Sequence, residues 1–405
     1  MTETAEILFD PADPEVRRNP YPVYKRLQTE APVWHAPWGT YYFSRYRDCF
    51  TLFRSPALSY DPFSSAAFLA TLAEDPAERE RQLKEFYLNR TVLEADPPEH
   101  TRLRSLFSKA FTPRSLADVG PVIDRLTDEL LDGHDGPDID LVADYAIVLP
   151  VRVICAMMGV PASEQPKFEL LAAAMVRTVD PQTPVEERIA ANKNLRDYIA
   201  ALVEIRRQHP GDDLMSRLME AADEGRLIGQ DEMLANTGLL LAAGFETTAS
   251  LITNAIYQLI QHPEERAALL AQPSLIRTAV EEALRYDPPT HMMRARTITG
   301  DVTIGGVELH PGDAVAPLLA AANRDPGEFD NPDTFDITRG VNRHMAFGLG
   351  HHMCVGAALA RMEAQAMVLR IFQRFPDVHL TPGTTPVIRP HLSVRGFEKL
   401  PVTLW

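Results

Sequence analysis

The sequence predicts a mainly α-helical fold with a minor β portion, and three features of the chain predict it. Apolar residues recur with helical spacing from about Pro113 to Tyr286, and again after Cys354. Proline and glycine clusters end the helices, but no break is long enough for an interdomain linker, so we expect a single domain over residues 1–405. Short strand-like runs lie near 40–44, 302–309 and 314–318, and within about the last thirty residues.

The composition is that of a globular protein and disfavours some partners. Of the 405 residues, 45% are apolar and 24% are charged, which is enough apolar material for a substantial core. The net charge of −16 disfavours nucleic acid as a partner, because phosphate binding needs a clustered positive surface. The three cysteines, Cys49, Cys155 and Cys354, are too few for a disulfide framework and favour a reducing compartment.

Neither a signal peptide nor a membrane span is expected. Residues 1–6 are partly acidic and have no apolar core segment. The most apolar window, residues 239–245, ends at Glu246 and is far too short to span a membrane. We therefore expect a soluble, cytoplasmic protein of bacterial type that does not use a membrane.

One helix is expected to cross the interior of the fold, because residues 231–261 are unusually long and apolar. Within it, Gly244 costs about 1 kcal/mol relative to alanine, and Glu246 is costly to bury without a partner. A structural explanation is that Thr247 bonds back to the Ala243 carbonyl while Glu246 pairs with a basic side chain.

Cys354 ends a glycine-rich loop, residues 347–356, directly before a predicted helix. Unpaired N–H groups and the helix dipole at such a position favour thiolate over thiol. Gly350 and Gly356 let the backbone turn tightly and approach a flat partner closely. Phe347 can shield the sulfur from water. A shielded thiolate beside a flat surface suits an axial ligand of haem iron, although a buried cysteine in an ordinary loop is the simpler alternative.

Two further pairs of charged residues stand at helical spacing. His100 and Arg104 face one side of a helix for which Asp96 is the expected N-cap. Glu282 and Arg285 are adjacent on the surface of another helix. Taken alone, such pairs are usually a solvated stripe or a surface ion pair of little energetic value.

The spacing of Phe347, Gly350, Cys354 and Gly356 resembles the haem-binding loop of the cytochrome P450 family. The resemblance implies the cytochrome P450 fold, with haem b held between a long distal helix and the proximal helix that follows the cysteine loop. It also implies a monooxygenase that inserts one oxygen atom from O2 into a C–H bond, by hydroxylation or epoxidation. Segments 100–104, 243–248 and 282–285 are similar to further motifs of that family, and all matches fall in the expected order.

The resemblance assigns roles to individual residues. Cys354 is implied as the iron ligand, Glu246 and Thr247 as the proton-delivering catalytic pair, and Gly244 as the residue that makes room for dioxygen. An architectural triad of Glu282, Arg285 and Arg339 is implied as well. The implied haem contacts are His100, Arg104, Ala243, Gly244, Arg296, Phe347, Gly348, His352, Cys354 and Gly356, with Arg294 as an alternative to Arg296 at the propionates.

The substrate pocket implied by the resemblance is largely apolar. Methionine-rich lining is adaptable, so we expect a lipophilic, medium-sized substrate such as a fatty acid, a polyketide or macrolide, or a terpenoid. Ordinary core filling is the alternative for the two methionines. The expected lining residues are Val92, Ala242, Ala243, Pro289, Thr290, His291, Met292, Met293 and Leu392.

Electrons are expected to come from a partner, because the chain shows no flavin or iron–sulfur motif. The resemblance implies a ferredoxin with an NAD(P)H-dependent ferredoxin reductase, and we expect a monomer. An acidic ferredoxin needs a local basic patch on this negatively charged chain. The candidates for that patch are Arg102, Lys109, Arg343 and Arg361.

Three other functions are alternatives to the monooxygenase. A peroxygenase driven by hydrogen peroxide tends to lack the acid and alcohol pair, and a non-catalytic haem-fold module that recruits partner enzymes is expected to lose that pair or the cysteine. A haem sensor would not need the pair. The chain keeps Cys354, Glu246 and Thr247, which favours the monooxygenase.

Overall fold

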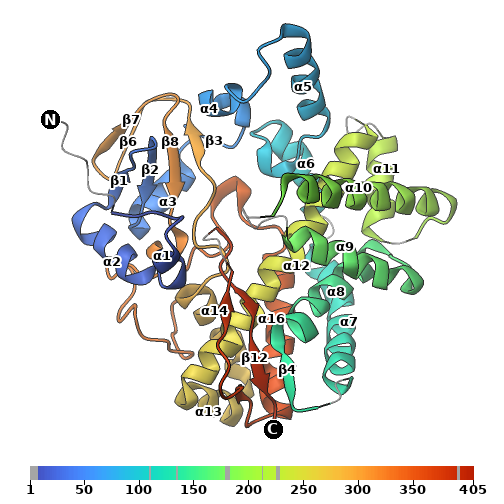
Figure 1. The fold of residues 1–405 in the computed structure, drawn as a ribbon, viewed down its shortest axis with the longest axis vertical. Coiled ribbons are helices and arrows are strands. Elements are labelled where there is room, and N and C mark those ends of the chain that lie inside the picture. The colour runs from blue at the N-terminus through green and yellow to red at the C-terminus, as the bar shows by residue number, and fades with distance from the viewer. Residues whose placement is uncertain are drawn as a thin grey trace. The chain divides into compact units, whose positions relative to one another are not determined.

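The computed structural model describes most of the chain (Figure 1). The described ranges are 8–108, 111–133, 136–177, 183–211, 213–224, 229–389 and 393–405. Within these ranges the side chains are described except those at positions 162, 173, 176, 177, 185, 221–223 and 242.

The chain divides into two compact units, each of which has its own core. The first unit comprises Met1–Leu69, Thr253–Cys354 and Thr384–Glu398. The second comprises Ala70–Ile252, Val355–Gly383 and Lys399–Trp405. The expectation of a single domain over residues 1–405 stays a prediction.

The first unit combines short helices with small sheets. Its helices are α1 (Pro14–Arg18), α2 (Tyr21–Glu30), α3 (Tyr46–Arg54), η1 (Pro62–Ser64), α4 (Ala66–Leu69), α13 (Pro263–Ala271), η5 (Pro273–Leu275), α14 (Ile276–Tyr286), α15 (Leu319–Ala322) and η6 (Gly350–His352). Its strands are β1 (Val33–His35), β2 (Thr40–Phe43), β3 (Leu58–Ser59), β5 (Arg296–Ile298), β6 (Val302–Ile304), β7 (Val307–Leu309), β8 (Ala314–Pro317), β10 (Val387–Ile388) and β11 (Phe397–Lys399), which ends one residue beyond the unit.

The largest sheet of the first unit has the strand order β1-β2-β8-β5-β3. Its central strands bury apolar side chains such as those of Phe43, Ile298 and Val315. The separate hairpin of β6 and β7 turns at Gly305 and Gly306, whose φ angles of +59° and +81° favour glycine. Glycine is required at Gly305 for a second reason, since an added Cβ would lie 2.6 Å from the Val33 side chain.

The second unit is mainly helical. Its sheet has the order β4-β12-β9, formed by β4 (Asp138–Asp140), β9 (His379–Leu380) and β12 (Pro401–Thr403). Its helices are α5 (Pro76–Leu88), η2 (Val92–Glu94), α6 (Glu99–Ser108), α7 (Pro113–Asp132), η3 (Val142–Ala146), α8 (Val148–Met158), η4 (Ala162–Glu164), α9 (Gln165–Arg177), α10 (Val185–Gln208), α11 (Leu214–Asp223) and α16 (Ala357–Arg374).

The long helix predicted over residues 231–261 is present as α12 (Gln230–Gln261) and is labelled in Figure 1. Its residues up to Ile252 belong to the second unit, where Leu240, Leu241 and Phe245 are buried in the core. In the described part of the chain, α12 alone is long and apolar enough to cross a membrane, but 76% of its most apolar stretch is buried within the fold. A core helix of a folded domain has the same properties.

Most element predictions are confirmed. The predicted strands near 40–44 and 314–318 are β2 and β8, and the run 302–309 is the β6–β7 hairpin. The predicted start of α6 is wrong, because the helix begins at Glu99 rather than directly after Asp96. Pro98 disfavours the helical conformation for the residue before it, which delays the start. Asp96 instead accepts the His100 N–H through its backbone carbonyl, at 2.9 Å.

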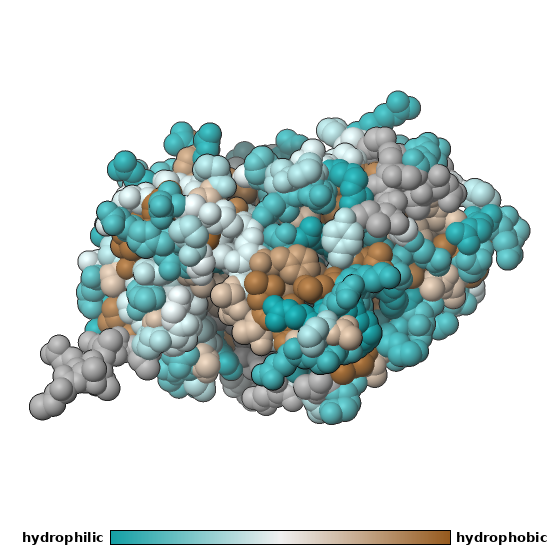
Figure 2. Space-filling model, turned by 90° about the horizontal axis from the view of Figure 1, so that it is seen from above, coloured by the Kyte–Doolittle hydropathy of each residue, from teal (hydrophilic) through white to brown (hydrophobic). Residues whose placement is uncertain are grey.

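Hydrophilic side chains cover much of the face shown in Figure 2, with hydrophobic patches between them. Highly exposed apolar side chains include Leu170, Ile189 and Val341, with exposed fractions of 74%, 63% and 68%. This mixture is ordinary, because a folded protein has too few polar groups to cover its whole surface.

Candidate active site

The loop before Cys354 is held by two glycines and by a backbone hydrogen bond. Gly348 and Gly350 have φ angles of +66° and +71°, in the left-handed region that favours glycine. Space is a second constraint at Gly350, where an added Cβ would lie 2.9 Å from the Phe53 carbonyl oxygen. The Cys354 N–H donates to the Phe347 carbonyl at 2.9 Å. The loop therefore holds the backbone of Cys354 in a defined position.

Cys354 differs from the two other cysteines in its exposure. Cys49 and Cys155 are buried, whereas Cys354 is exposed. Burial raises the pKa of the Cys155 thiol to about 12 and raises the pKa of the Cys49 thiol strongly as well. These two side chains therefore stay neutral thiols in the core, and Cys354 is the cysteine whose sulfur can meet a ligand.

Helix α16 starts at Ala357, three residues after Cys354, with Gly356 as its N-cap. The N–H groups of the first helical turn have no partner within the helix, and their partial positive charge stabilises an anion nearby. Gly356 has a φ of −84°, which is open to any residue, so its backbone conformation does not require glycine. Gly348 and Gly350 make the turn instead. The expected close approach of Gly356 to a flat partner stays a prediction.

Tyr60 brings together two of the expected haem-contacting side chains of the first unit. The His352 ring stacks on the Tyr60 ring with a centroid distance of 3.6 Å and an interplanar angle of 19°. The guanidinium carbon of Arg296 lies 4.7 Å from the centroid of the same ring. Arg294 is exposed. Of the two arginines, the geometry therefore favours Arg296 as the one that would bind a propionate together with His352.

Sequence reasoning did not single out Tyr60, and strand register explains its position. Strands β3 and β5 are antiparallel, with Ser59 opposite Thr297. Continuing this register by one residue places Tyr60 opposite Arg296. The signal in the sequence is an aromatic residue directly after a short strand, but the partner strand is more than two hundred residues away along the chain.

One face of α12 is open. Ala243 and Gly244 are exposed, and no described atom lies within 4 Å of a Cβ added at Gly244. One turn on, Thr247 Oγ1 donates to the Ala243 carbonyl at 2.9 Å, which is the structural explanation considered for this residue. Glu246 is 7% exposed. Thr248 Oγ1 donates to the Gly244 carbonyl at 2.8 Å, and the residue is 3% exposed, which gives its hydroxyl a structural role.

Helix α6 carries two further expected haem-contacting residues, His100 and Arg104. His100 is 3% exposed, and Arg104 is half-buried one turn later on the same face. Arg102 donates two hydrogen bonds, of 2.7 and 2.9 Å, to the buried carboxylate of Glu232 on α12. Arg102 therefore serves an internal ion pair, which weakens its assignment to a docking patch. Lys109, also expected in that patch, lies outside the described residues.

The Glu282 carboxylate is the centre of a buried hydrogen-bond cluster in the first unit. It accepts two hydrogen bonds of 2.8 Å from Arg285 and one of 3.1 Å from Arg339. Asn342 and the Asp336 N–H donate to it as well, at 3.1 and 3.0 Å. Glu282 and Arg285 are both 0% exposed. The cluster joins α14 to the segment that leads to the cysteine loop.

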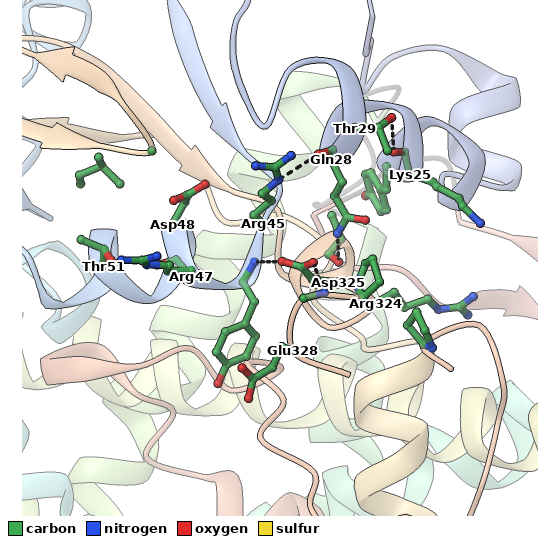
Figure 3. A pocket seen from close by; sticks show the side chains of 18 of the residues that line it. Lys25, Gln28, Thr29, Arg45, Arg47, Asp48, Thr51, Arg324, Asp325 and Glu328 are labelled. Carbon is green, nitrogen blue, oxygen red and sulfur yellow. Dashed lines mark hydrogen bonds between the residues drawn. The ribbon is translucent and has the colours of Figure 1, made fainter. Parts of the chain in front are cut away.

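A cavity of about 1000 Å³ in the first unit is lined mainly by polar and charged side chains (Figure 3). Several of them are occupied by internal hydrogen bonds. Arg45 Nε donates to the Gln28 carbonyl at 2.9 Å, and the Asp325 carboxylate accepts the Tyr46 N–H at 2.7 Å. These bonds join α2, α3 and the segment after α15. The residues assigned to chemistry do not line this cavity, so we do not place the active site there.

Comparison with known proteins decides the family. A family model described as Cytochrome P450 matches residues 163–403. The vitamin D(3) 25-hydroxylase of Pseudonocardia autotrophica is 38% identical over 96% of this chain and 94% of its own length. The chain belongs to the cytochrome P450 family. A second relative, the polyketide biosynthesis cytochrome P450 PksS of Bacillus subtilis, is 33% identical over 98% of this chain and 99% of its own.

A solved cytochrome P450 structure has the same fold. CYP164A2 of Mycobacterium smegmatis with econazole bound matches with a TM-score of 0.85 and 38% identity, over 97% of this chain and 98% of that one. The predicted fold class is confirmed. Membership of the cytochrome P450 family also makes the chain a haem-thiolate enzyme of the monooxygenase class.

The residues expected to line the substrate pocket of this cytochrome P450 fall in both units. Val92 is 7% exposed and packs in the core of the second unit. Met292 and Met293 are half-buried and pack against the cores of the first unit, so ordinary core filling accounts for part of their surface. Pro289 is buried and Thr290 is half-buried. Leu392 and the side chain of Ala242 lie outside the described residues.

His291 is wrong as a pocket residue of this cytochrome P450. Its side chain is 0% exposed, and its ring nitrogens lie 3.1 Å from the Asp287 carboxylate and 3.4 Å from the Tyr24 hydroxyl. Burial lowers the pKa of His291 to about 4, so the ring is neutral at pH 7. The residue belongs to a structural network, because both ring nitrogens are occupied.

The side chains of this cytochrome P450 fit a haem group. The exposed Cys354 sulfur lies three residues before a helix N-terminus that favours its anionic form. The face at Ala243 and Gly244 is open and would leave room for a flat ring system, because a Cβ added at Gly244 would meet no described atom within 4 Å. Arg296 and His352 supply donors of the kind that bind carboxylates.

Proposed function

We propose that this cytochrome P450 inserts one oxygen atom from O2 into a C–H bond of a lipophilic, medium-sized substrate, by hydroxylation or epoxidation. The observation that carries the proposal is the exposed Cys354 sulfur before α16, in a chain whose other cysteines are buried. Haem, which we propose is haem b, supplies dioxygen activation when bound, and a thiolate ligand favours cleavage of the O–O bond.

In this proposal the Cys354 sulfur holds the haem iron and basic side chains hold the propionates. An arginine fork matches a carboxylate with two parallel hydrogen bonds. Tyr60 contacts both Arg296 and His352 and so restrains these side chains before any ligand binds. They therefore lose less conformational entropy when they bind an anion. The proposed haem contacts are His100, Arg104, Ala243, Gly244, Arg296, Phe347, Gly348, His352, Cys354 and Gly356.

Glu246 and Thr247 are proposed to deliver protons. They are neighbours on α12, and Thr247 Oγ1 lies one turn from the exposed Ala243 and Gly244. The Thr247 proton points to the Ala243 carbonyl, so the hydroxyl must rotate away from that bond before it donates to an oxygen atom above the open face. Glu246 can then return a proton to it, which is general acid catalysis by a positioned pair.

The proposed substrate class is lipophilic and of medium size. Two relatives support it by their names, a vitamin D(3) hydroxylase and a cytochrome P450 of polyketide biosynthesis. The exposed apolar face at Ala243 and Gly244 offers apolar surface to such a molecule. The proposed pocket residues are Val92, Ala242, Ala243, Pro289, Met292, Met293 and Leu392.

The proposed electron source is a ferredoxin with its NAD(P)H-dependent reductase, acting on a monomeric, cytoplasmic enzyme. The net charge of −16 repels an acidic partner, so a basic patch is needed. Arg343 is exposed, and its Nη1 atom lies 3.7 Å from a carboxylate oxygen of Glu328. Arg361 lies on α16, one turn into the helix that follows Cys354. Of the expected patch residues, these two fit best.

The proposal is tested with the purified holoprotein. Carbon monoxide bound to the reduced protein should give the red-shifted Soret band of thiolate ligation, and Cys354→Ala should lose it while Cys155→Ala keeps it. Fatty acids, steroids and macrolides are then titrated into the ferric protein, and the Soret shift on displacement of axial water ranks them. Imidazole-type ligation in the wild type, or tight binding of small polar molecules alone, would contradict the proposal.

A further inference from the structure

The side chain of Asn236 on α12 clamps the segment that carries Val92. Asn236 is 1% exposed, and its Oδ1 accepts the Val92 N–H at 2.9 Å. Its Nδ2 donates to the Arg90 carbonyl and to the Glu232 carbonyl, each at 2.9 Å. One amide group therefore satisfies two backbone groups of residues 90–92 and is itself fixed to its own helix.

Asn236 lies on the same face of α12 as Thr247. Residues seven and eleven positions along an α-helix return to nearly the same direction, so Asn236, Ala243 and Thr247 share one face. Ala243 on this face is exposed. The clamp thus holds residues 90–92 along the helix face that carries the proposed proton donor, about two turns from Ala243.

Two ion pairs hold the same junction from neighbouring helices. Arg196 on α10 donates to Asn89 Oδ1 at 2.8 Å and also bonds the Asp231 carboxylate at the start of α12. Arg102 on α6 forms its double hydrogen bond with Glu232, one turn before Asn236. The chain on both sides of residues 90–92 is therefore tied to the first turns of α12.

Apolar packing before this segment is weak. In α5, which ends at Leu88, each described residue is exposed or half-buried. Val92 in contrast packs in the same core cluster as Leu240 and Leu241 of α12. The position of Val92 therefore depends on the Asn236 bonds, on the core cluster that Val92 shares with α12, and on the packing of η2 against α6. The exposed helix that precedes the segment contributes little.

We propose that Asn236 is the positioning residue that sets the apolar wall beside the open face of α12, and thereby sets the affinity for bulky lipophilic molecules. The inference rests on the proposed function, in which that face is the substrate side of the haem. Without the amide, the Val92 N–H and the Arg90 carbonyl lose their buried partner, and this segment must move to find water. The wall then no longer matches a large apolar ligand, whereas a small ligand has no contact to lose.

The experiment compares Asn236→Ala with Asn192→Ala in the holoprotein. Asn192 is an exposed asparagine on α10 whose amide bonds its own helix, at the Arg188 carbonyl. Two azoles are titrated and followed by the Soret shift of iron coordination: imidazole, which is small, and econazole, which adds bulky apolar groups to the same imidazole ring. Hydrogen exchange at the Val92 amide is measured on the same samples.

We expect Asn236→Ala to weaken econazole binding about tenfold while imidazole binding stays within about twofold, and to speed exchange at Val92. Asn192→Ala should change none of the three. The inference is overturned if Asn236→Ala loses the same factor of affinity for both azoles, or loses affinity for neither. Asn236→Asp keeps the acceptor for the Val92 N–H but loses both donated hydrogen bonds. If the alanine variant does not fold, a loss of econazole affinity without a loss of imidazole affinity in Asn236→Asp tests the inference in its place. A wild-type protein without the thiolate spectrum defeats the proposed function instead, and exchange at Val92 then still decides whether the clamp exists.

Discussion

The guanidinium of Arg285 donates two hydrogen bonds of 2.8 Å to the carboxylate of Glu282, and both side chains are fully buried. Charges taken out of water are tolerated when each remaining lone pair and proton finds a partner. Arg339 and Asn342 also donate to the Glu282 carboxylate, each at 3.1 Å, and the Asp336 N–H donates to it at 3.0 Å. Arg285 also donates hydrogen bonds from Nη1 and Nη2 to the carbonyls of Asn323, Pro332 and Thr334. Removing one member of this cluster therefore leaves a buried charged group without its hydrogen-bond partner.

Glu282→Ala should therefore lose folding and haem together. The substitution leaves the Arg285 guanidinium buried without its carboxylate, which costs about 3–5 kcal/mol. The measurements are the yield of soluble protein, the unfolding midpoint in urea and the haem content per chain. Glu398→Ala, at an exposed position of β11, is the matched control and should leave all three unchanged. A soluble Glu282→Ala protein with full haem content would contradict this prediction.

Glu363 on α16 predicts a dependence of stability on pH. Its side chain is 2% exposed, Oε2 has no hydrogen-bond partner among the described residues, and burial raises its pKa to about 8. The same carboxyl titrates near pH 4.3 in an unfolded chain, or about 4 units lower. The folded state therefore holds a proton that the unfolded state releases. That contribution to stability is full below about pH 4.3 and is lost as pH rises through about 8.

Glu363→Gln removes this titration. The variant and the wild type should differ least in free energy of unfolding at or below about pH 4, and between about pH 5 and pH 8 the variant should gain on the wild type by about 1.4 kcal/mol per pH unit. Urea unfolding at several pH values measures the difference, with Glu398→Gln as an exposed control. A variant that keeps the pH dependence of the wild type would show that Glu363 is not the group responsible.

Local patterns predicted the elements and much of the site. The apolar period of residues 231–261 predicted α12 to within one residue at its start, and the strand-like run near 302–309 predicted the strands β6 and β7. Both depend on neighbours along the chain. The E-x-x-R spacing likewise placed Glu282 and Arg285 side by side on α14.

Contacts between distant segments were not predictable from one sequence. Tyr60 meets Arg296 because β3 pairs with β5, and the sequence does not state that pairing. Asn236 and His291 were not recognised as structural residues for the same reason, since each bonds partners on other elements. Arg102 was expected at the surface for its charge, but its buried partner Glu232 lies 130 residues away.

Arg361→Glu should slow reduction of the haem by ferredoxin. Charge reversal at a docking site lowers the rate of encounter, and we expect a loss of about tenfold at low ionic strength that shrinks as salt screens the surface. Stopped-flow reduction with a purified ferredoxin, at low and high salt, measures it. Arg79→Glu, at an exposed position of α5, makes the same change of net charge and serves as the control. Equal rates for the two variants would remove Arg361 from the proposed patch.

Thr247→Val separates proton delivery from the structural role of the same hydroxyl. Thr247 and Thr248 each bond back to a carbonyl four residues earlier, at 2.9 and 2.8 Å, so valine at either position loses one such bond at similar cost. They differ in exposure, because Thr247 is half-buried near the open face and Thr248 is 3% exposed.

If Thr247 delivers protons, the product formed per NADPH consumed should fall about tenfold or more in Thr247→Val and stay within about twofold in Thr248→Val. Product is counted by mass spectrometry against NADPH absorbance, with a substrate found in the spectral titration. Equal coupling in both variants would mean that the bond to the Ala243 carbonyl is the whole role of the Thr247 hydroxyl, and that the protons reach the oxygen by another route.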